Sequence, residues 1–431
     1  MCENPKSFFR NPVFFSIYFT LWFTVFVVLF GAISLLWEQH DPFSLPFFLS
    51  LPVQFREHYS RGTHIKVQTS RTVSPIDVFA YQSENNPNAT ENVVIVHGLG
   101  LNSFGFRDVV DTLGAKGFHA VSFDLPGHGF SNKTMEVLEE GSERGVPGRM
   151  LDVYYFIREK GLFWAFDRIV ETGMLPYDEI LENFSRKRAV TKPASLRNDE
   201  VGMVLMQIIN AMELAPVHLV LHDASLSIVG PWISQNPRLV RSVSLLDVGL
   251  KPAVPLWLMD VPAASILSMA STVVYKGLIS FCCSRGIPYS ELLGHRKLYR
   301  TGMVAMREMS SKLNESFDVV EWSNSEVIKG IPVEVIWSKN WSTRWSKQGD
   351  KVSKAFSSAI PVTHSGGRWP NKDSSREIAD HITEFIGSLP KSSRPNSENI
   401  RPVISKAQAR ETVNAYPDLT DVEGSGQEWE T

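Results

Sequence analysis

Cysteine is scarce in this sequence, which has only Cys2, Cys282 and Cys283 in 431 residues. Three cysteines make no disulfide framework of the kind that stabilises small secreted domains. We interpret the adjacent pair as two small residues in an apolar segment. An excess of either charge is also missing, because 43 Lys and Arg stand against 46 Asp and Glu. This balance argues against nucleic acid as a partner, since such proteins need a basic face.

Several chemical motifs are absent as well. The eleven histidines show no His-Glu-x-x-His or comparable spacing, so no metal site is predicted. No glycine-rich phosphate loop or dinucleotide fingerprint occurs, and we therefore expect no cofactor. No internal repeat is evident.

One long uncharged run is present near the N-terminus. Residues 13–37 are almost wholly apolar or aromatic, and at ~1.5 Å per residue they reach further than the roughly 30 Å hydrocarbon core of a bilayer. The alternative is a cleaved signal peptide, but its apolar part usually has about 7–15 residues. Lys6 and Arg10 precede the run. The positive-inside rule then predicts a cytosolic segment 1–12, a transmembrane anchor and a folded domain across the membrane.

The rest of the chain predicts an α/β fold, a mostly parallel sheet flanked by helices with helical insertions. Apolar strand-like runs alternate with amphipathic helices, which favours parallel βαβ units. The expected strands are 64–68, 76–81, 92–96, 118–123, 216–221, 242–247, 333–338 and 359–363, and the expected helices are 104–116, 199–213, 226–236 and 374–386. We expect a stalk at 38–52, a domain at 53–388 with an inserted helical region at 132–197 and a helical lid at 249–330, and a disordered tail at 389–431.

Two glycine-containing turns resemble those of α/β-hydrolases. His97-Gly98-Leu99-Gly100 follows the strand at 92–96, and Asp124-Leu125-Pro126-Gly127-His128-Gly129 follows the next strand. In that fold the first turn supplies a backbone N–H to the oxyanion hole. The two turns together indicate the fold, and neither indicates activity.

The stretch LVLHDASLS resembles the nucleophile turn of epoxide hydrolases and haloalkane dehalogenases. Those enzymes use an aspartate in a His-Asp-x-Gly-Gly turn between a strand and a helix. The resemblance places Asp223 in the nucleophile position and His222 before it. Leu221, Ser225 and Leu226 occupy positions that the family fills with glycine.

The expected catalytic base is missing. The family places a histidine before an aromatic residue and proline, whereas this chain has Arg368 before Trp369 and Pro370. Arginine stays protonated and cannot act as a general base near neutral pH. His364 is a displaced candidate base, and Asp247 is a candidate orienting acid or, equally, a turn-capping residue.

We therefore interpret Asp223, His364 and Asp247 as vestiges of a catalytic site and expect no enzymatic activity. One alternative is a membrane-anchored hydrolase of the epoxide hydrolase type, with Asp223 as nucleophile and a small apolar substrate. Another is a pocket that binds a small acid through Arg368 without turnover.

Several longer strings resemble a more specific family, the plant auxin-resistant four proteins. They include FFLSLP, REHYSRGTHIKVQ, GLFWAFDRIVETGMLPY and THSGGRWP, and the resemblance runs from the anchor to about Pro390. It implies a single-pass protein of the endoplasmic reticulum membrane with a cytosolic N-terminus. Its implied role is a chaperone-like one, in which it helps the auxin influx carrier leave that compartment and reach its polarised place in the plasma membrane.

The resemblance implies the carrier and the membrane as partners, and it specifies no small-molecule ligand. A helper of this kind needs apolar surface near the bilayer, and Phe163–Tyr177 or Pro255–Phe281 are the candidate segments. Packing of these segments over the sheet as a lid is the alternative.

Overall fold

The computed structural model describes residues 45–390 except 71, 85–88, 90, 140–169, 172–187, 250, 257–270, 314–316, 340, 357–358 and 371, together with residues 20 and 22–24. The described chain from 45 to 383 belongs to one compact unit, and a second unit begins at 384. The expected cytosolic segment 1–12, most of the expected anchor 13–37 and all but the first two residues of the expected tail lie outside the described residues. Among the helices that are described, none has the length and apolar character needed to cross a bilayer.

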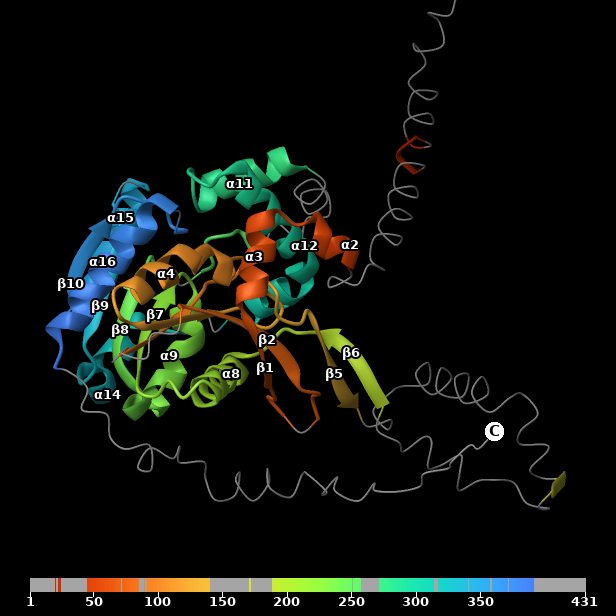
Figure 1. The fold of residues 1–431 in the computed structure, drawn as a ribbon, viewed down its shortest axis with the longest axis horizontal. Helices are drawn as coiled ribbons and strands as arrows, with labels where there is room; N and C mark the ends of the chain where they lie inside the picture. The colour runs from red at the N-terminus through yellow and green to blue at the C-terminus, as the bar shows by residue number, and fades with distance from the viewer. Residues whose placement is uncertain are drawn as a thin grey trace, which may run out of the picture. The chain divides into compact units, whose positions relative to one another are not determined.

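A mostly parallel eight-stranded sheet forms the centre of the first unit, as the sequence predicts (Figure 1). Its order is β1-β2-β4-β3-β7-β8-β9-β10, in which β1 and β2 are antiparallel to their neighbours and the others are parallel. The strands are β1 (Thr63–Val67), β2 (Ile76–Gln82), β3 (Asn92–Val96), β4 (His119–Phe123), β7 (Val217–His222), β8 (Val240–Leu246), β9 (Val333–Ser338) and β10 (Ile360–His364). The predicted bounds of β3 and β9 are the observed ones.

Helices cover both faces of this sheet. Helix α4 lies on one face, and α8 and α9 lie on the other (Figure 1). Val93, Val94, Ile95 and Val96 of β3 are fully buried, as expected for a strand covered on both sides. The described helices are α2 (Leu45–Ser50), α3 (Val53–Arg61), α4 (Arg107–Ala115), α8 (Asn198–Ala211), α9 (Ser225–Gln235), α11 (Thr272–Cys282), α12 (Tyr289–Ser311), α13 (Val319–Asn324), α14 (Glu326–Lys329), α15 (Thr343–Ala355) and α16 (Lys372–Ser388), with 3₁₀ turns η2 (Ser103–Phe106) and η4 (Pro237–Leu239).

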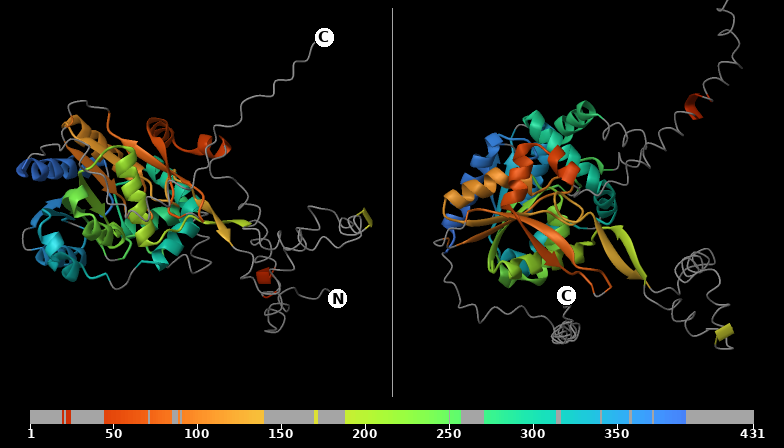
Figure 2. Two further views of the ribbon diagram at one scale, coloured as in Figure 1. Left: turned by 90° about the horizontal axis from the view of Figure 1, so that it is seen from below. Right: turned by 45° about the vertical axis from the view of Figure 1, so that its right-hand side comes forward.

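The structure describes the expected insertion and the expected stalk only in part. The described ends of the region 132–197 are not helices but an antiparallel ribbon of β5 (Thr134–Glu139) and β6 (Arg188–Pro193), which projects away from the main sheet (Figure 2). The ribbon places both ends of the insertion side by side, and most of the region between them lies outside the described residues. The expected stalk is also partly structured, because its residues 45–50 form α2.

Two further helices escape prediction. Helix α3 follows the stalk and buries Phe55 and His58 against the domain. Helix α15 lies between β9 and β10, and the Ser342 hydroxyl caps it by accepting the N–H of Trp345. The segment expected as a lid, 249–330, contains α11 to α14. Helix α11 ends at Cys282, and the carbonyl of Cys283 accepts the N–H of Trp369 in the loop after β10. This part of the segment therefore lies at the carboxyl ends of the parallel strands, where α/β sheets place their sites.

Candidate functional site

Asp223 occupies the sharp turn between β7 and α9, where the sequence places the nucleophile. Its φ of 54° lies in the left-handed region, which a residue other than glycine adopts at an energetic cost. The Asp223 N–H donates to the carbonyl of Leu246 on the neighbouring strand at 3.2 Å. The turn therefore forms without the glycines that the enzyme family uses at this place.

Gly98, in the turn after β3, packs directly against this aspartate. A Cβ atom at position 98 would lie 2.5 Å from the Cβ and 2.8 Å from Oδ2 of Asp223. Only glycine permits so close an approach of the two turns. Asp223 is consequently almost completely buried, with 1% of its surface exposed.

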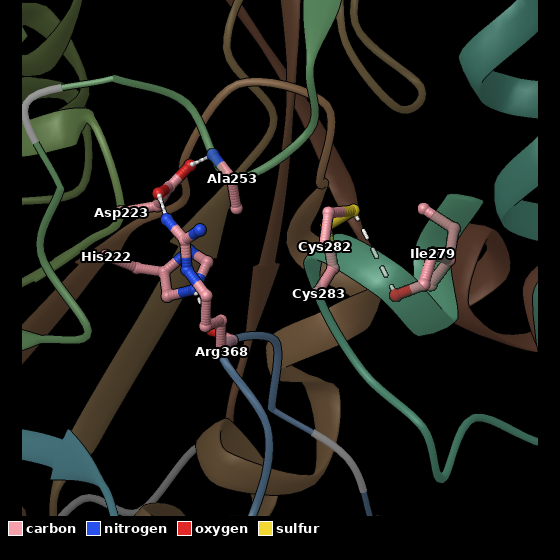
Figure 3. The surroundings of a disulfide bond; sticks show 7 residues. All are labelled: His222, Asp223, Ala253, Ile279, Cys282, Cys283 and Arg368. Carbon is pink, nitrogen blue, oxygen red and sulfur yellow. Dashed lines mark hydrogen bonds and ion pairs between the residues drawn. A yellow bond between two sulfur atoms is a disulfide. The ribbon is translucent and has the colours of Figure 1, made fainter. Parts of the chain in front are cut away.

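Both carboxylate oxygens of Asp223 are occupied by groups of the chain itself (Figure 3). Oδ1 forms an ion pair with Nη2 of Arg368 at 3.0 Å, and Oδ2 accepts the N–H of Ala253 at 2.8 Å. The guanidinium carbon of Arg368 lies 3.7 Å from the ring centroid of Trp345 on α15. Stacking on the aromatic face and pairing with the carboxylate fix the arginine over Asp223.

His222 holds the backbone of the same arginine. Its Nε2–H donates to the carbonyl of Arg368 at 2.7 Å, and its Nδ1 accepts the N–H of Gly98 at 3.3 Å. Burial lowers the pKa of His222 to about 4, so the ring is neutral and has one donor and one acceptor. The N–H of Gly98, in the turn that supplies an oxyanion-hole donor in hydrolases, is thereby used inside the protein.

Burial raises the pKa of Asp223 to about 6, and the charge of Arg368 and the N–H groups of Ala253 and Ala224 oppose this shift. Above that pH the carboxyl is ionised and paired with Arg368. The buried ion pair is then the resting state of the site at neutral pH.

This pKa predicts a pH-dependent contribution to stability. The pKa of Asp223 in the unfolded chain is about 3.9, so the folded state binds this proton more tightly. The stabilising contribution is full below about pH 4 and is lost as pH rises through 6. We expect the free energy of unfolding of the wild type, minus that of Asp223→Asn, to fall by about 2 kcal/mol between pH 4 and 7. Urea denaturation across this range measures it, and parallel pH curves for the two proteins would refute it.

His364 and Asp247 form a separate buried pair at the ends of β10 and β8. Nε2–H of His364 donates to Oδ2 of Asp247 at 2.6 Å, and Nδ1 of His364 accepts the N–H of Gly366 at 3.2 Å. Oδ1 of Asp247 accepts the N–H and hydroxyl of Ser338 at 2.9 and 2.6 Å and the indole N–H of Trp345 at 2.8 Å. Asp247 thus organises the ends of three elements, and both ring nitrogens of His364 are used locally.

The three predicted site residues are therefore brought together only in part. His364 and Asp247 meet, but in the described part of the chain no hydrogen bond or ion pair joins either of them to Asp223. A general base must reach the proton that it removes, either directly or through one water. Arg368 lies beside Asp223 instead of a histidine. The carboxylate that pairs with Arg368 is therefore that of Asp223, whereas the sequence suggested a bound small acid as its partner.

The second glycine-containing turn has a structural role. Asp124 accepts the N–H groups of Ser103 and Phe130, each at 2.6 Å, and His97 accepts the N–H of Leu125 at 3.0 Å. These bonds tie the turns after β3 and β4 to each other. Neither turn directs a free side chain at Asp223.

Sequence reasoning missed three contributors to the site. Trp345 and Ala253 belong to no motif, and their contacts with Arg368 and Asp223 depend on the tertiary fold. The interpretation of the cysteine pair was wrong, because Cys282 and Cys283 form a disulfide (Figure 3). Their adjacency in the sequence was the signal for it. In the described residues no group of three or more His, Cys, Asp or Glu side chains is arranged to hold a metal ion.

No protein-family model matches the sequence. Solved structures with a similar fold include a membrane phospholipase A described as a bacterial virulence factor, which is 15% identical with a TM-score of 0.50 over 85% of this chain and 97% of that chain. A thermophilic esterase from Thermogutta terrifontis is 11% identical with a TM-score of 0.51 over 75% of this chain and 98% of that chain. A candidate lipase from Acinetobacter baumannii AYE is 14% identical with a TM-score of 0.51 over 79% of this chain and 95% of that chain. Identities this low show the fold alone. The chain has an α/β-hydrolase-like fold.

Proposed function

We propose that this chain is a non-catalytic accessory protein of the endoplasmic reticulum membrane, anchored by residues 13–37, that helps the auxin influx carrier leave this compartment. The observation that carries the non-catalytic part is the buried ion pair of Asp223 with Arg368. The compartment and the carrier rest on the sequence resemblance to the auxin-resistant four family.

The ion pair opposes hydrolysis for a simple chemical reason. A nucleophilic carboxylate must direct a free oxygen at the substrate, whereas both oxygens of Asp223 are engaged by Arg368 and Ala253. Arg368, whose guanidinium covers this carboxylate, stays protonated and cannot accept a proton. His364, the remaining candidate base, uses both ring nitrogens within its own neighbourhood.

Exposed apolar side chains on α11 support a binding role. Val273, Val274 and Phe281 are 78%, 42% and 82% exposed. A side chain at Gly277, between them on the same face, would meet nothing within 4 Å. Lys276 is also exposed on this helix. A mainly apolar exposed helix face of this kind is typical of a surface that contacts a membrane or another protein. This helix is the described end of the segment Pro255–Phe281, which we expected to supply apolar surface.

The proposal is tested by imaging the carrier in plant cells that lack this protein. We expect retention of the carrier in the endoplasmic reticulum, restored delivery with the wild-type chain, and weaker delivery with Val273→Ser/Phe281→Ser at matched abundance. The control is Val320→Ser on α13, which changes a side chain that is 53% exposed on a helix outside the α11 face. Delivery of the carrier that does not depend on this protein would contradict the proposal.

A hydrolase of the epoxide hydrolase type is the second candidate, favoured by the intact turn at Asp223 and by the His364–Asp247 pair. It requires Arg368 to leave the carboxylate before substrate binds. Incubation with small epoxides and peptide mass spectrometry tests this candidate directly. A covalent ester on Asp223 that is missing in Asp223→Asn would establish it, and an unmodified Asp223 peptide across the series would exclude it.

A further inference from the structure

The disulfide between Cys282 and Cys283 ends helix α11, and nothing in the proposed function uses it. A bond between adjacent cysteines closes a small ring through their own peptide unit, which restricts the rotation of that backbone. Cys283 is fully buried, and Cys282 is 6% exposed. The chain therefore has a rigid covalent turn inside the protein at the point where α11 ends and the chain continues to α12.

This turn packs against the loop that carries Arg368. The carbonyl of Cys283 accepts the N–H of Trp369 at 2.9 Å. A Cβ atom at Gly367 would lie 2.8 Å from the same carbonyl oxygen and 3.1 Å from Cα of Ser284. The residues on both sides of Arg368 are thus in direct contact with the disulfide turn, with no space for a side chain between them.

The opposite side of the same loop contacts the candidate site. The carbonyl of Arg368 accepts Nε2–H of His222, and its guanidinium pairs with Asp223. In Figure 3 the disulfide lies on one side of the Arg368 side chain and Asp223 on the other. Residues 367–369 therefore connect the oxidation state of Cys282 and Cys283 with the position of Arg368.

We propose that Cys282–Cys283 is a site of thiol–disulfide exchange whose oxidised form holds Arg368 on Asp223. Its co-reactant is a dithiol. One thiolate of the reductant attacks Sγ of Cys282, the more exposed cysteine, breaks the S–S bond and forms a mixed disulfide. The second thiol then displaces Cys282. The protein gains two electrons and two protons and ends with two thiols, while the reductant becomes a disulfide.

Reduction opens the ring and frees rotation about the Cα–C bond of Cys282 and the N–Cα bond of Cys283. The carbonyl of Cys283 lies just outside the ring and is attached to Cα of Cys283, so this rotation displaces it. The hydrogen bond from Trp369 then opens more often, and the loop that carries Arg368 loses one of its supports. The hydrogen bond with His222, the ion pair with Asp223 and the stacking on Trp345 remain. Reduction therefore makes the carboxylate of Asp223 more accessible, whether the protein acts as an accessory factor or as a hydrolase.

The test uses the full chain in a Cys2→Ser background, with hydrogen exchange of the 366–370 peptides followed by mass spectrometry. We expect exchange at the Trp369 amide to become roughly five- to tenfold faster after treatment with dithiothreitol, which corresponds to the loss of about one hydrogen bond. Cys282→Ser/Cys283→Ser should show the fast rate without reductant and no response to it. The control amide is Lys339, which donates to the carbonyl of His364 and should not change.

Two results would overturn the proposal. One is free thiols at both cysteines in protein that has never met a reductant. The other is unchanged exchange at Trp369 when thiol alkylation shows that the bond has been reduced. If the double serine variant does not fold, reduction of the wild-type disulfide still decides the question. Carbodiimide labelling of Asp223 gives a second readout and should increase on reduction.

Discussion

Replacement of Arg368 by methionine is expected to lower the free energy of unfolding by about 3–5 kcal/mol at pH 8. Methionine keeps an apolar side chain beside Trp345 but leaves the ionised Asp223 buried without its partner, since Asp223 is only 1% exposed. At pH 5 the loss should be smaller. The pKa of Asp223 is already about 6 with the arginine present and rises further without it, so the carboxyl is then protonated. Urea denaturation at the two pH values measures the difference.

Two variants serve as controls for this result. Asp223→Asn/Arg368→Met removes both charges and should recover most of the loss, because an uncharged pair has no desolvation penalty. Arg285→Met removes a guanidinium that lies 4.8 Å from the ring centroid of Trp341 at an exposed position, and should cost less than about 1 kcal/mol. An equal loss for Arg368→Met at pH 5 and pH 8 would show that the charge of Asp223 does not determine the effect.

Replacement of Asp247 by alanine is expected to cost about 4 kcal/mol. Its carboxylate accepts hydrogen bonds from His364, Ser338 and Trp345 in a buried site. The change leaves several buried donors without acceptors, and each typically costs about 1–3 kcal/mol. Thermal and urea unfolding of the purified variant measure the loss.

Asp318→Ala is the matched control for that experiment. Asp318 accepts the N–H groups of Val320 and Glu321 at the start of α13, so it is an aspartate with an ordinary capping role. Its removal should cost about 1 kcal/mol. Equal losses for the two variants would mean that Asp247 is only a turn-capping residue, which was one of the two interpretations that the sequence allows.

The central sheet could be predicted because local composition determines it. Continuous runs such as Val93–Val96 are apolar on both sides and have few alternatives to a buried parallel strand. Helix α15 was missed for the opposite reason, since its only buried side chains are Trp345 and Val352, apart from Gly349. Two buried side chains in thirteen residues give no apolar stripe that indicates a helix.

In the candidate site, too, some features could be predicted from local sequence and others depend on the tertiary fold. The position of Asp223 followed from a short motif, and the alternative hydrolase hypothesis named His364 as the displaced base and Asp247 as its orienting acid. The ion pair between Asp223 and Arg368 joins residues 145 apart in the sequence, and no local pattern encodes it. The adjacency of Cys282 and Cys283 was visible in the sequence, but the disulfide between them was not predicted, and its contact with the Arg368 loop depends on the tertiary fold.

The central claim is that the protein acts without chemistry at Asp223. The most direct test is the delivery of the auxin influx carrier to the plasma membrane by Asp223→Asn/Arg368→Met, in plant cells that lack the protein and with abundance matched to the wild type. This variant removes the nucleophile and keeps the site filled by an uncharged pair. Full delivery is the expected result. Retention of the carrier, although the variant is folded and normally abundant, would contradict the account and return Asp223 to a catalytic or ligand-binding role.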